Sequence, residues 1–332
     1  MKRAEYWETK DKVVKCLLCP RYCVLNPGER GNCKARKNLD GKLYSIVYAK
    51  PVASYIDPVE KKPLFHFLPG TTALSIGTAG CNLHCKFCQN WSISQANPED
   101  IPSEGLLPEQ VIQLAEKNSC SSIAYTYTEP GIFYEYVLDT AKLAKKKGIK
   151  NIMVTNAFLN PAPIKELYRY IDAANIDFKA FSKDFYQKIC DGMLEPVLDA
   201  MKLIKKSGAW IEITNLLIPT LNDKQEIITD MCKWIVNYLG KDTPLHFSRF
   251  FPDYMLRDLP ATQPSALYKA HDTAKKVGLN YAYIGNMVTD KESTFCPRCG
   301  ALVIQRFGFQ ILQNNMKNGK CPCGEKIAGV WK

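Results

Sequence analysis

Long apolar runs are missing from this sequence. The N-terminal stretch from Met1 to Lys15 has no hydrophobic segment of the length that a signal peptide needs. No later segment reaches the roughly 18 to 20 apolar residues of a membrane-spanning helix. Internal repeats and low-complexity tracts are also missing, which argues against repeat architectures and disordered tails. We therefore expect a folded cytoplasmic protein that does not bind a membrane.

Cysteine, in contrast, is abundant, with 14 residues in the chain. Because a reducing cytosol keeps thiols free, metal ligation explains so many cysteines better than disulfides do. Cys120, Cys190 and Cys232 stand alone in apolar surroundings and are interpreted as small buried hydrophobes. The others form three groups: Cys16, Cys19, Cys23 and Cys33; Cys81, Cys85 and Cys88; Cys296, Cys299, Cys321 and Cys323.

The formal net charge of +11 suggests a nucleic-acid partner, and the first 50 residues hold 12 Lys/Arg against 5 Asp/Glu. Metal ligation weakens that interpretation, because four thiolates around Zn²⁺ carry about −2 and a three-cysteine [4Fe-4S] cluster about −1. Many of the remaining lysines, such as Lys145 to Lys147, are spread over predicted helix faces. We expect solvated helix faces rather than nucleic-acid binding, with a docking surface for an acidic partner protein as the alternative.

From residue 72 onward, short β-branched or aromatic runs alternate with amphipathic segments, which is typical of a parallel α/β sheet. Six such βα units are too few to close an eight-unit barrel, so the sequence predicts an α/β fold with an open, partial (β/α)6 TIM-like barrel. Strands are predicted at 72–77, 122–128, 151–155, 174–179, 210–217, 244–249 and 280–284. Helices are predicted at 108–117, 131–147, 162–171, 193–207, 224–239 and 265–278.

The division of the chain follows from the same pattern. Residues 72–287 form the predicted barrel, and 41–71, which contain four prolines, form an extended connection packed on it. Residues 1–40 and 288–332 are cysteine-rich and have too little apolar sequence for independent cores. Each of these two modules is therefore expected to need a metal for folding.

The central cysteine group lies directly after the first predicted barrel strand and has C-x3-C-x2-C spacing. Three thiolates can bind three irons of a [4Fe-4S] cluster and leave the fourth iron open to a chelating ligand. A structural zinc site ordinarily has four protein ligands, so the odd number favours the cluster. The alternatives are a zinc site completed by His84 and unligated core thiols.

In this segment the sequence resembles the radical S-adenosylmethionine (SAM) superfamily, whose signature has this spacing and an aromatic residue at the position of Phe87. The resemblance implies that SAM chelates the open iron and that Phe87 flanks its adenine. It also implies that a reduced cluster cleaves SAM to methionine and a 5′-deoxyadenosyl radical, which abstracts hydrogen from a substrate. In such an oxidoreductase the cofactor supplies the chemistry, while the protein positions it and excludes water.

Polar residues at the ends of the next three predicted strands also resemble superfamily motifs. The second strand ends where the family has a GGE segment, although both glycines are replaced here. The third and fourth resemble the TNG and D-x-K segments of glycyl-radical activating enzymes. Structural alternatives are a helix cap by Glu129 and an ion pair between Asp177 and Lys179. The SAM-contacting residues that the resemblance implies are Phe87, Thr128, Glu129, Thr155, Asn156, Asp177 and Lys179.

The two terminal groups supply four cysteines each. Cys296 and Cys299, followed by Cys321 and Cys323, form paired knuckles with glycine, which is typical of a zinc ribbon or rubredoxin-like site. We expect Zn²⁺ there, ahead of iron. Cys16, Cys19, Cys23 and Cys33 also provide four ligands. We expect Zn²⁺ there first, with a second iron-sulfur cluster as the competing interpretation, because spacing does not separate the two.

The resemblance continues beyond the triad to the radical SAM member of the AmmeMemoRadiSam system. It rests on C-x2-C-P-x2-C-x9-C at the N-terminus, Glu60 to Gly70, Cys88-Gln89-Asn90-Trp91 and Tyr283 to Asn286. Members are often labelled homologues of pyruvate formate-lyase-activating enzyme. That enzyme type has an acid where this chain has Val154, and it lacks both terminal cysteine groups, so a different substrate is expected. The family name implies Memo-like and Amme-type partners.

Three functions are therefore considered. In the first, the chain is a radical SAM enzyme that modifies or activates a protein partner. In the second, it is a radical SAM enzyme that acts on a small molecule enclosed by the barrel. In the third, it is a non-catalytic metal protein that binds nucleic acid. The third has no use for three cysteines at a strand end. The natural electron donor for the first two is a low-potential ferredoxin or flavodoxin.

Overall fold

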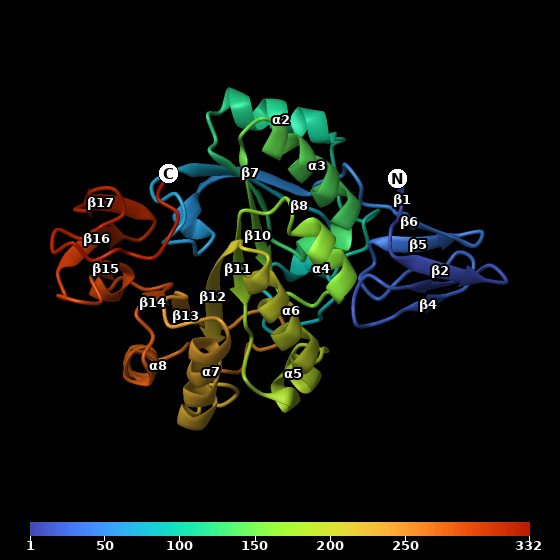
Figure 1. Ribbon diagram of the computed structural model, residues 1–332. Coiled ribbons are helices and arrows are strands. Elements are labelled where there is room, and N and C mark those ends of the chain that lie inside the picture. The colour runs from blue at the N-terminus through green and yellow to red at the C-terminus, as the bar shows by residue number, and fades with distance from the viewer.

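The computed structural model describes all 332 residues, and its centre is one eight-stranded sheet (Figure 1). The strand order is β14-β13-β12-β11-β10-β9-β8-β7. All pairs from β8 to β14 are parallel, and β7 pairs antiparallel with β8. The strands are β7 (Ala53–Pro58), β8 (Thr72–Gly77), β9 (Ser122–Tyr125), β10 (Lys150–Thr155), β11 (Ala173–Asp177), β12 (Trp210–Leu217), β13 (Leu245–Arg249) and β14 (Ala282–Gly285).

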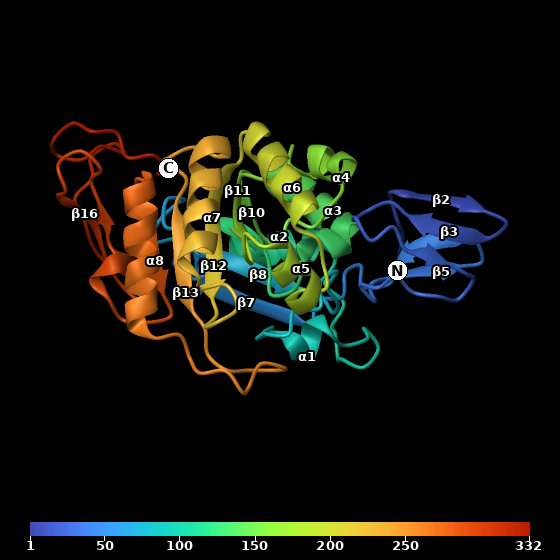
Figure 2. The same ribbon diagram turned by 90° about the horizontal axis from the view of Figure 1, so that it is seen from below.

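Helices follow the strands and cover one face of the curved sheet (Figure 2). They turn an apolar stripe inward; the buried residues of α7 include Ile228, Met231, Cys232 and Ile235, which share one helix face. Because β7 and β14 do not pair, the barrel is open. The predicted α/β partial barrel is thus confirmed. The helices are α1 (Trp91–Ser94), α2 (Pro108–Lys117), α3 (Tyr134–Lys146), α4 (Pro161–Leu167), α5 (Lys183–Ile189), α6 (Leu194–Lys206), α7 (Gln225–Tyr238) and α8 (Pro264–Val277).

The segment of residues 41–71, predicted to be an extended connection packed on the barrel, contains strands of two sheets. It contains β6 (Lys42–Ser45), which pairs with β5 (Arg36–Leu39) and β1 (Lys2–Arg3). It also contains β7, which is an edge strand of the central sheet, and the short helix η1 (Val59–Lys61). Pro58 is tolerated because it ends an edge strand, where a ladder donor is not needed. The prediction of a mere connection is corrected, because this segment contributes strands to two sheets.

Small sheets lie at opposite ends of the barrel (Figures 1 and 2). The N-terminal side adds β2 (Trp7–Lys10), β3 (Val13–Cys16) and β4 (Val24–Leu25), and the C-terminal side has β15 (Thr294–Phe295), β16 (Leu302–Phe307) and β17 (Gln310–Asn314). Two further short helices are η2 (Pro130–Phe133) and η3 (Asp290–Glu292). None of the helices combines the length and the hydropathy needed to cross a bilayer.

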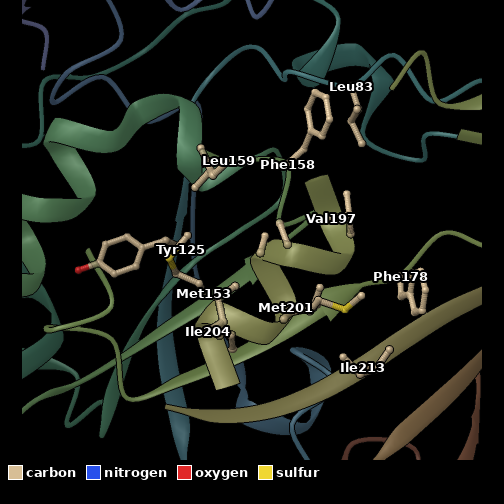
Figure 3. Packing of buried hydrophobic residues seen from close by; sticks show 14 of the residues in the cluster. Leu83, Tyr125, Met153, Phe158, Leu159, Phe178, Val197, Met201, Ile204 and Ile213 are labelled. Carbon is tan, nitrogen blue, oxygen red and sulfur yellow. The ribbon is translucent and has the colours of Figure 1, made fainter. Parts of the chain in front are cut away.

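The N-terminal and C-terminal modules belong to different hydrophobic clusters. The main cluster of 71 buried residues joins sheet and helices, and Val197, Met201 and Ile204 of α6 point toward the strands that carry Met153 and Ile213 (Figure 3). The same cluster includes Cys16, Cys19 and Cys33 of the N-terminal side. The C-terminal cysteines Cys296 and Cys321 instead belong to a separate cluster of 8 residues. The N-terminal side therefore shares the main barrel core, while the C-terminal side packs in a small separate cluster with Phe65, Tyr281 and Tyr283.

Candidate active site at the open end of the barrel

A cavity of about 870 Å³, solvent at its mouth included, lies at the carboxyl ends of the barrel strands. Loops from successive parallel strands meet there because the strands all end at the same edge of the sheet. The residues that line the cavity are Cys81, Leu83, Cys85, Phe87, Cys88, Gln89, Asn90, Ser94, Tyr127, Thr128, Glu129, Asn156, Asp177, Lys179, Thr214, Leu216, Ser248 and Asn286.

The cysteine triad, Cys81, Cys85 and Cys88, contributes all three of its side chains to this cavity. Burial raises the pKa of Cys81, and the interaction with the Cys190 thiol, together with burial, raises the pKa of Cys85. As free thiols these groups hold their protons at neutral pH, so ligation to a metal must drive their deprotonation. Three convergent thiols without a fourth cysteine in the wall fit a [4Fe-4S] cluster with one open iron.

A zinc site completed by His84 does not fit. One ring nitrogen of His84 lies 2.5 Å from Oε1 of Gln95 and the other 2.7 Å from Oδ1 of Asn32. Both nitrogens are thus occupied by amide groups, and His84 does not line the cavity. Of the two alternatives to a cluster, this one is removed by the hydrogen-bond pattern.

Glu129 is buried at the cavity wall, and its carboxylate accepts three hydrogen bonds. The N–H of Gly131 and the hydroxyl of Thr155 donate to Oε1, both at 2.8 Å, and the N–H of Asn156 donates to Oε2 at 2.7 Å. Burial raises the pKa of Glu129 to about 7, although these donors pull it down. The bond from Gly131 also caps η2, so the helix-capping alternative is correct and coexists with a position in the cavity.

Asp177 and Lys179 form an ion pair of 2.9 Å on the cavity wall. Burial alone would lower the pKa of Lys179, but Asp177 and the nearby Cys85 raise it, so the lysine stays charged. Its Nζ lies 5.8 Å from the centre of the Phe87 ring. The pair therefore places one cation and one anion beside the aromatic residue of the triad loop.

Of the three remaining residues predicted to contact SAM, two line the cavity and one lies behind its wall. Asn156 lines it and donates from Nδ2 to Oδ1 of Asn82 at 2.9 Å. Thr128 also lines it and is held by a 2.9 Å bond to the carbonyl of Thr78. Thr155 does not line the cavity; it lies behind Glu129 and orients that carboxylate. Direct contact between Thr155 and a ligand in this cavity is therefore not supported.

Sequence reasoning missed residues that contact the triad loop but lie far from it in the chain. The carbonyl of Cys190, just after α5, accepts from the N–H of His84 at 3.0 Å, and the carbonyl of Ile189 accepts from that of Lys86 at 2.9 Å. Cys190, interpreted as a lone buried thiol, is in fact a neighbour of Cys85. No sequence signal predicts this contact, because the two cysteines are more than 100 positions apart.

Small polar residues form the far side of the cavity. Ser248 of β13 accepts a 2.9 Å bond from Nδ2 of Asn286, which follows β14, and Thr214 of β12 lies nearby in the wall. His246, on the same strand as Ser248, is not part of the cavity, because its ring binds the buried Glu212 at 2.7 Å. The far side can bind a polar substrate group, and His246 serves the barrel interior.

The C-terminal cysteines are arranged for one metal ion. The sulfurs of Cys296, Cys299, Cys321 and Cys323 all lie within 4.8 Å of one another. Two of the sulfur pairs are 3.7 Å apart. Four thiolates at a Zn–S distance of about 2.3 Å around a tetrahedral ion would be separated by about 3.8 Å, so the set fits Zn²⁺ or a single iron.

Comparisons with known proteins agree with this geometry. A family model, the Radical SAM superfamily, matches residues 75–232. MJ0808 of Methanocaldococcus jannaschii, an uncharacterized protein, is 45% identical over 98% of this chain and 99% of its own. With its cysteine triad at the open end of a partial barrel, the chain contains a radical SAM domain over residues 75–232.

Solved structures of low sequence identity share the fold. SuiB of Streptococcus suis bound to S-adenosylmethionine has a TM-score of 0.51 at 11% identity, over 69% of this chain and 53% of that chain. A radical SAM methyltransferase from Sphaerobacter thermophilus has a TM-score of 0.50 at 13% identity, over 66% and 67%. The family supports reductive cleavage of SAM with an iron-sulfur cluster; these two structures support the barrel alone.

Proposed function

We propose that this radical SAM enzyme abstracts hydrogen from a protein partner, in the manner of an activating enzyme. The supporting observation is the surface beside the cavity mouth. Trp91 follows the cavity residue Asn90 and stacks on Tyr254, with ring centres 5.2 Å apart and planes at 10°. Met255 hydrogen-bonds through its N–H to Lys86 of the triad loop, and both Trp91 and Met255 are exposed. Exposed aromatic and Met side chains are enriched in protein interfaces.

The residues of the cavity have distinct roles in this proposal. When bound, the cluster and SAM supply the one-electron cleavage that yields a hydrogen-abstracting radical. Cys81, Cys85 and Cys88 hold the cluster, and Phe87 packs against the adenine. Glu129 accepts a hydrogen bond from the amino group of SAM, since a cation nearby favours its ionised form.

The ion pair and the cavity walls complete the binding site. Lys179 supplies positive charge for the carboxylate of SAM, and Asp177 holds that lysine in place. Buried apolar walls such as Leu83 keep water away from the reacting centre. A low-potential ferredoxin or flavodoxin is the proposed electron donor, and the 14 free cysteines suit the reducing cytoplasm.

Membership of the AmmeMemoRadiSam system is part of the proposal and rests on the sequence resemblance of its motifs, one of which forms a well-defined loop. In the motif Glu60 to Gly70, the N–H of Gly70 donates to Glu60 at 2.8 Å and closes the segment into a loop. The backbone N–H groups of Phe65 and His66 donate to the buried Glu212 at 3.0 and 2.7 Å. The motif thus anchors the segment before β8 inside the barrel. Memo-like and Amme-type proteins are the first partners to test.

A small-molecule substrate is the second candidate. It is favoured by the polar far side of the cavity, where Thr214, Ser248 and Asn286 face a space that a small metabolite can enter.

Transfer of deuterium separates the two candidates. Anaerobically reconstituted enzyme, SAM and dithionite are incubated either with deuterated partner proteins or with a deuterated metabolite extract. We expect deuterium in 5′-deoxyadenosine only with the protein arm, and Trp91→Ala should reduce that transfer at least tenfold. If deuterium enters 5′-deoxyadenosine only from the metabolite extract, the proposal is wrong and a small molecule is the substrate.

A further inference from the structure

The four N-terminal cysteines, Cys16, Cys19, Cys23 and Cys33, differ from the C-terminal four in the spacing of their sulfurs. The C-terminal sulfurs form the one set of three or more candidate metal ligands whose atoms all lie within 4.8 Å. Neither the N-terminal cysteines nor the catalytic triad form such a set. Thiolates that bind different irons of a cluster lie farther apart than thiolates that share one ion. In this respect the N-terminal group resembles the triad.

The N-terminal sulfurs nevertheless face a common region. A side chain at Gly31 would meet the sulfur of Cys33 at 3.7 Å and that of Cys23 at 3.8 Å. Backbone pairing joins Cys16 to Cys23, with an N–H to carbonyl distance of 2.9 Å. None of these cysteines forms a disulfide, and three of the four, Cys16, Cys19 and Cys33, are buried.

A buried arginine completes this environment. Nη1 of Arg36 lies 3.6 Å from the sulfur of Cys16, and its Nη2 pairs with Glu135 of α3. The side chains of Arg36 and Glu135 are 1% and 0% exposed. Hydrogen bonds to ligand sulfur and exclusion of water are the means by which proteins set the potential of iron-sulfur clusters.

We propose that Cys16, Cys19, Cys23 and Cys33 bind a second [4Fe-4S] cluster, which passes electrons to the cluster held by the catalytic triad. The presence of this second cluster does not depend on the proposed function; its role as an electron relay does. Zinc is the alternative metal, and iron analysis distinguishes the two.

The relay role follows from direct contact between the two cysteine loops. A Cβ at Gly80 would lie 2.2 Å from the carbonyl oxygen of Cys33, so only glycine, at φ +97°, lets this oxygen contact the residue before Cys81. His84, inside the triad, lies 2.7 Å from Oδ1 of Asn32. The residue before an N-terminal ligand and the residue before a catalytic ligand thus both take part in the contact.

One further hydrogen bond joins the two loops, and a second joins the N-terminal loop to Asn160, which follows β10. Nε of Arg21 donates to the carbonyl of Asn82 at 2.6 Å, and the N–H of Asn160 donates to the carbonyl of Leu18 at 3.0 Å. A path therefore runs from Cys33 through a non-bonded contact with Gly80 to Cys81.

The electron balance is simple. One electron from a reduced low-potential ferredoxin or flavodoxin takes the N-terminal cluster from the 2+ to the 1+ state. Transfer to the catalytic cluster returns the N-terminal cluster to 2+ and reduces the acceptor to 1+. That electron then enters the S–C5′ bond of SAM, which breaks into methionine and the 5′-deoxyadenosyl radical.

Iron, zinc and sulfide analysis of cysteine variants tests the cluster. The Cys81, Cys85, Cys88 triple alanine variant should keep about four irons and about four sulfides, with an EPR signal that SAM does not change. Cys23→Ala should lower the iron of the otherwise intact enzyme from about eight to about four, while Cys120→Ala, at a lone buried cysteine, should leave it at about eight. A triple variant with two zincs and no iron would overturn the proposal.

The relay is tested by comparing two electron sources. The rate of 5′-deoxyadenosine formation driven by reduced flavodoxin, divided by the rate driven by dithionite, should fall at least tenfold in Cys23→Ala and stay constant in Cys120→Ala. A ratio that does not change in Cys23→Ala would refute the relay. If the wild type forms no 5′-deoxyadenosine at all, the proposed function fails, whereas the iron content of the triple variant still decides the second cluster.

Discussion

The two cysteine-rich ends of the molecule each supply four cysteines, but they differ in how they pack against the barrel. The N-terminal cysteines are mostly buried, share the main core and contact the catalytic loop. The C-terminal ribbon exposes Cys299 and Cys323 and packs as a separate small core around Phe65 and Tyr283. A four-cysteine pattern alone therefore does not define a role. The two groups differ in their position relative to the open end of the barrel, and only the N-terminal group contacts the triad loop.

The largest expected effect concerns the buried ion pair that joins the N-terminal end to the barrel. Arg36→Met leaves Glu135 as an unpaired buried charge, and such changes typically destabilise a protein by about 3–5 kcal/mol. At the other end, Arg298→Ala breaks an ion pair whose side chains are 66% and 27% exposed, and we expect a loss of at most about 1 kcal/mol. Denaturant unfolding of both variants measures the difference. Equal losses would contradict the structural contrast between the two ends.

Affinity for SAM is the next test, because it probes the site that the N-terminal end contacts. Glu129→Gln removes a charged hydrogen-bond partner, worth about 1.5–3 kcal/mol, so the Kd for SAM should rise roughly tenfold to a hundredfold with iron content unchanged. Since the pKa of Glu129 is about 7, protonation should also weaken SAM binding by the wild type as the pH falls below 7. The variant has no carboxyl group to titrate and should lack this pH dependence. Titration calorimetry under anaerobic conditions from pH 6 to 8 measures both; a wild-type affinity that is constant over that range would exclude the assigned role.

Metal removal compares the ends directly. A strong chelator should strip about one zinc from the ribbon well before it removes iron, because Cys299 and Cys323 are exposed while most N-terminal sulfurs are buried. Time-resolved metal analysis of the native protein gives the order of loss. Iron leaving first, or both metals leaving together, would show that burial does not distinguish the two ends.

The smallest expected effect is at Cys190. Cys190→Ala and Cys232→Ala each remove one fully buried sulfur and should cost similar stability, of the order of 1–2 kcal/mol. Cys190 also neighbours Cys85, so its substitution alone should change the EPR spectrum of the reduced catalytic cluster. Identical spectra for the two variants would mean that Cys190 only fills space.

Much of the barrel could be predicted from the sequence because its signals are local. β8 and β12 coincide with the predicted 72–77 and 210–217, and α2 with 108–117, since each has a clear hydrophobic period bounded by turn residues. β7 was missed because the prolines around it favour an extended connection, and its pairing with β8 is a tertiary property. α5, which has seven residues, was not predicted.

The candidate site was predictable to the extent that it follows strand ends. Cys81, Glu129 and Asp177 meet in one cavity because neighbouring parallel strands end at one edge. Contacts made across the sequence could not be predicted: Cys190 beside Cys85, and Cys33 against Gly80. These depend on the packing of loops, which has no local sequence signature.

Formation of 5′-deoxyadenosine tests the central account most directly. Anaerobically reconstituted wild type, given SAM and dithionite, should form 5′-deoxyadenosine and methionine in equal amounts. The Cys81, Cys85, Cys88 triple alanine variant should form neither above background, although its N-terminal iron remains. Cleavage of SAM that persists in the triple variant, or a wild type whose reduced cluster never cleaves SAM even with candidate partners present, would contradict the assignment of this cavity.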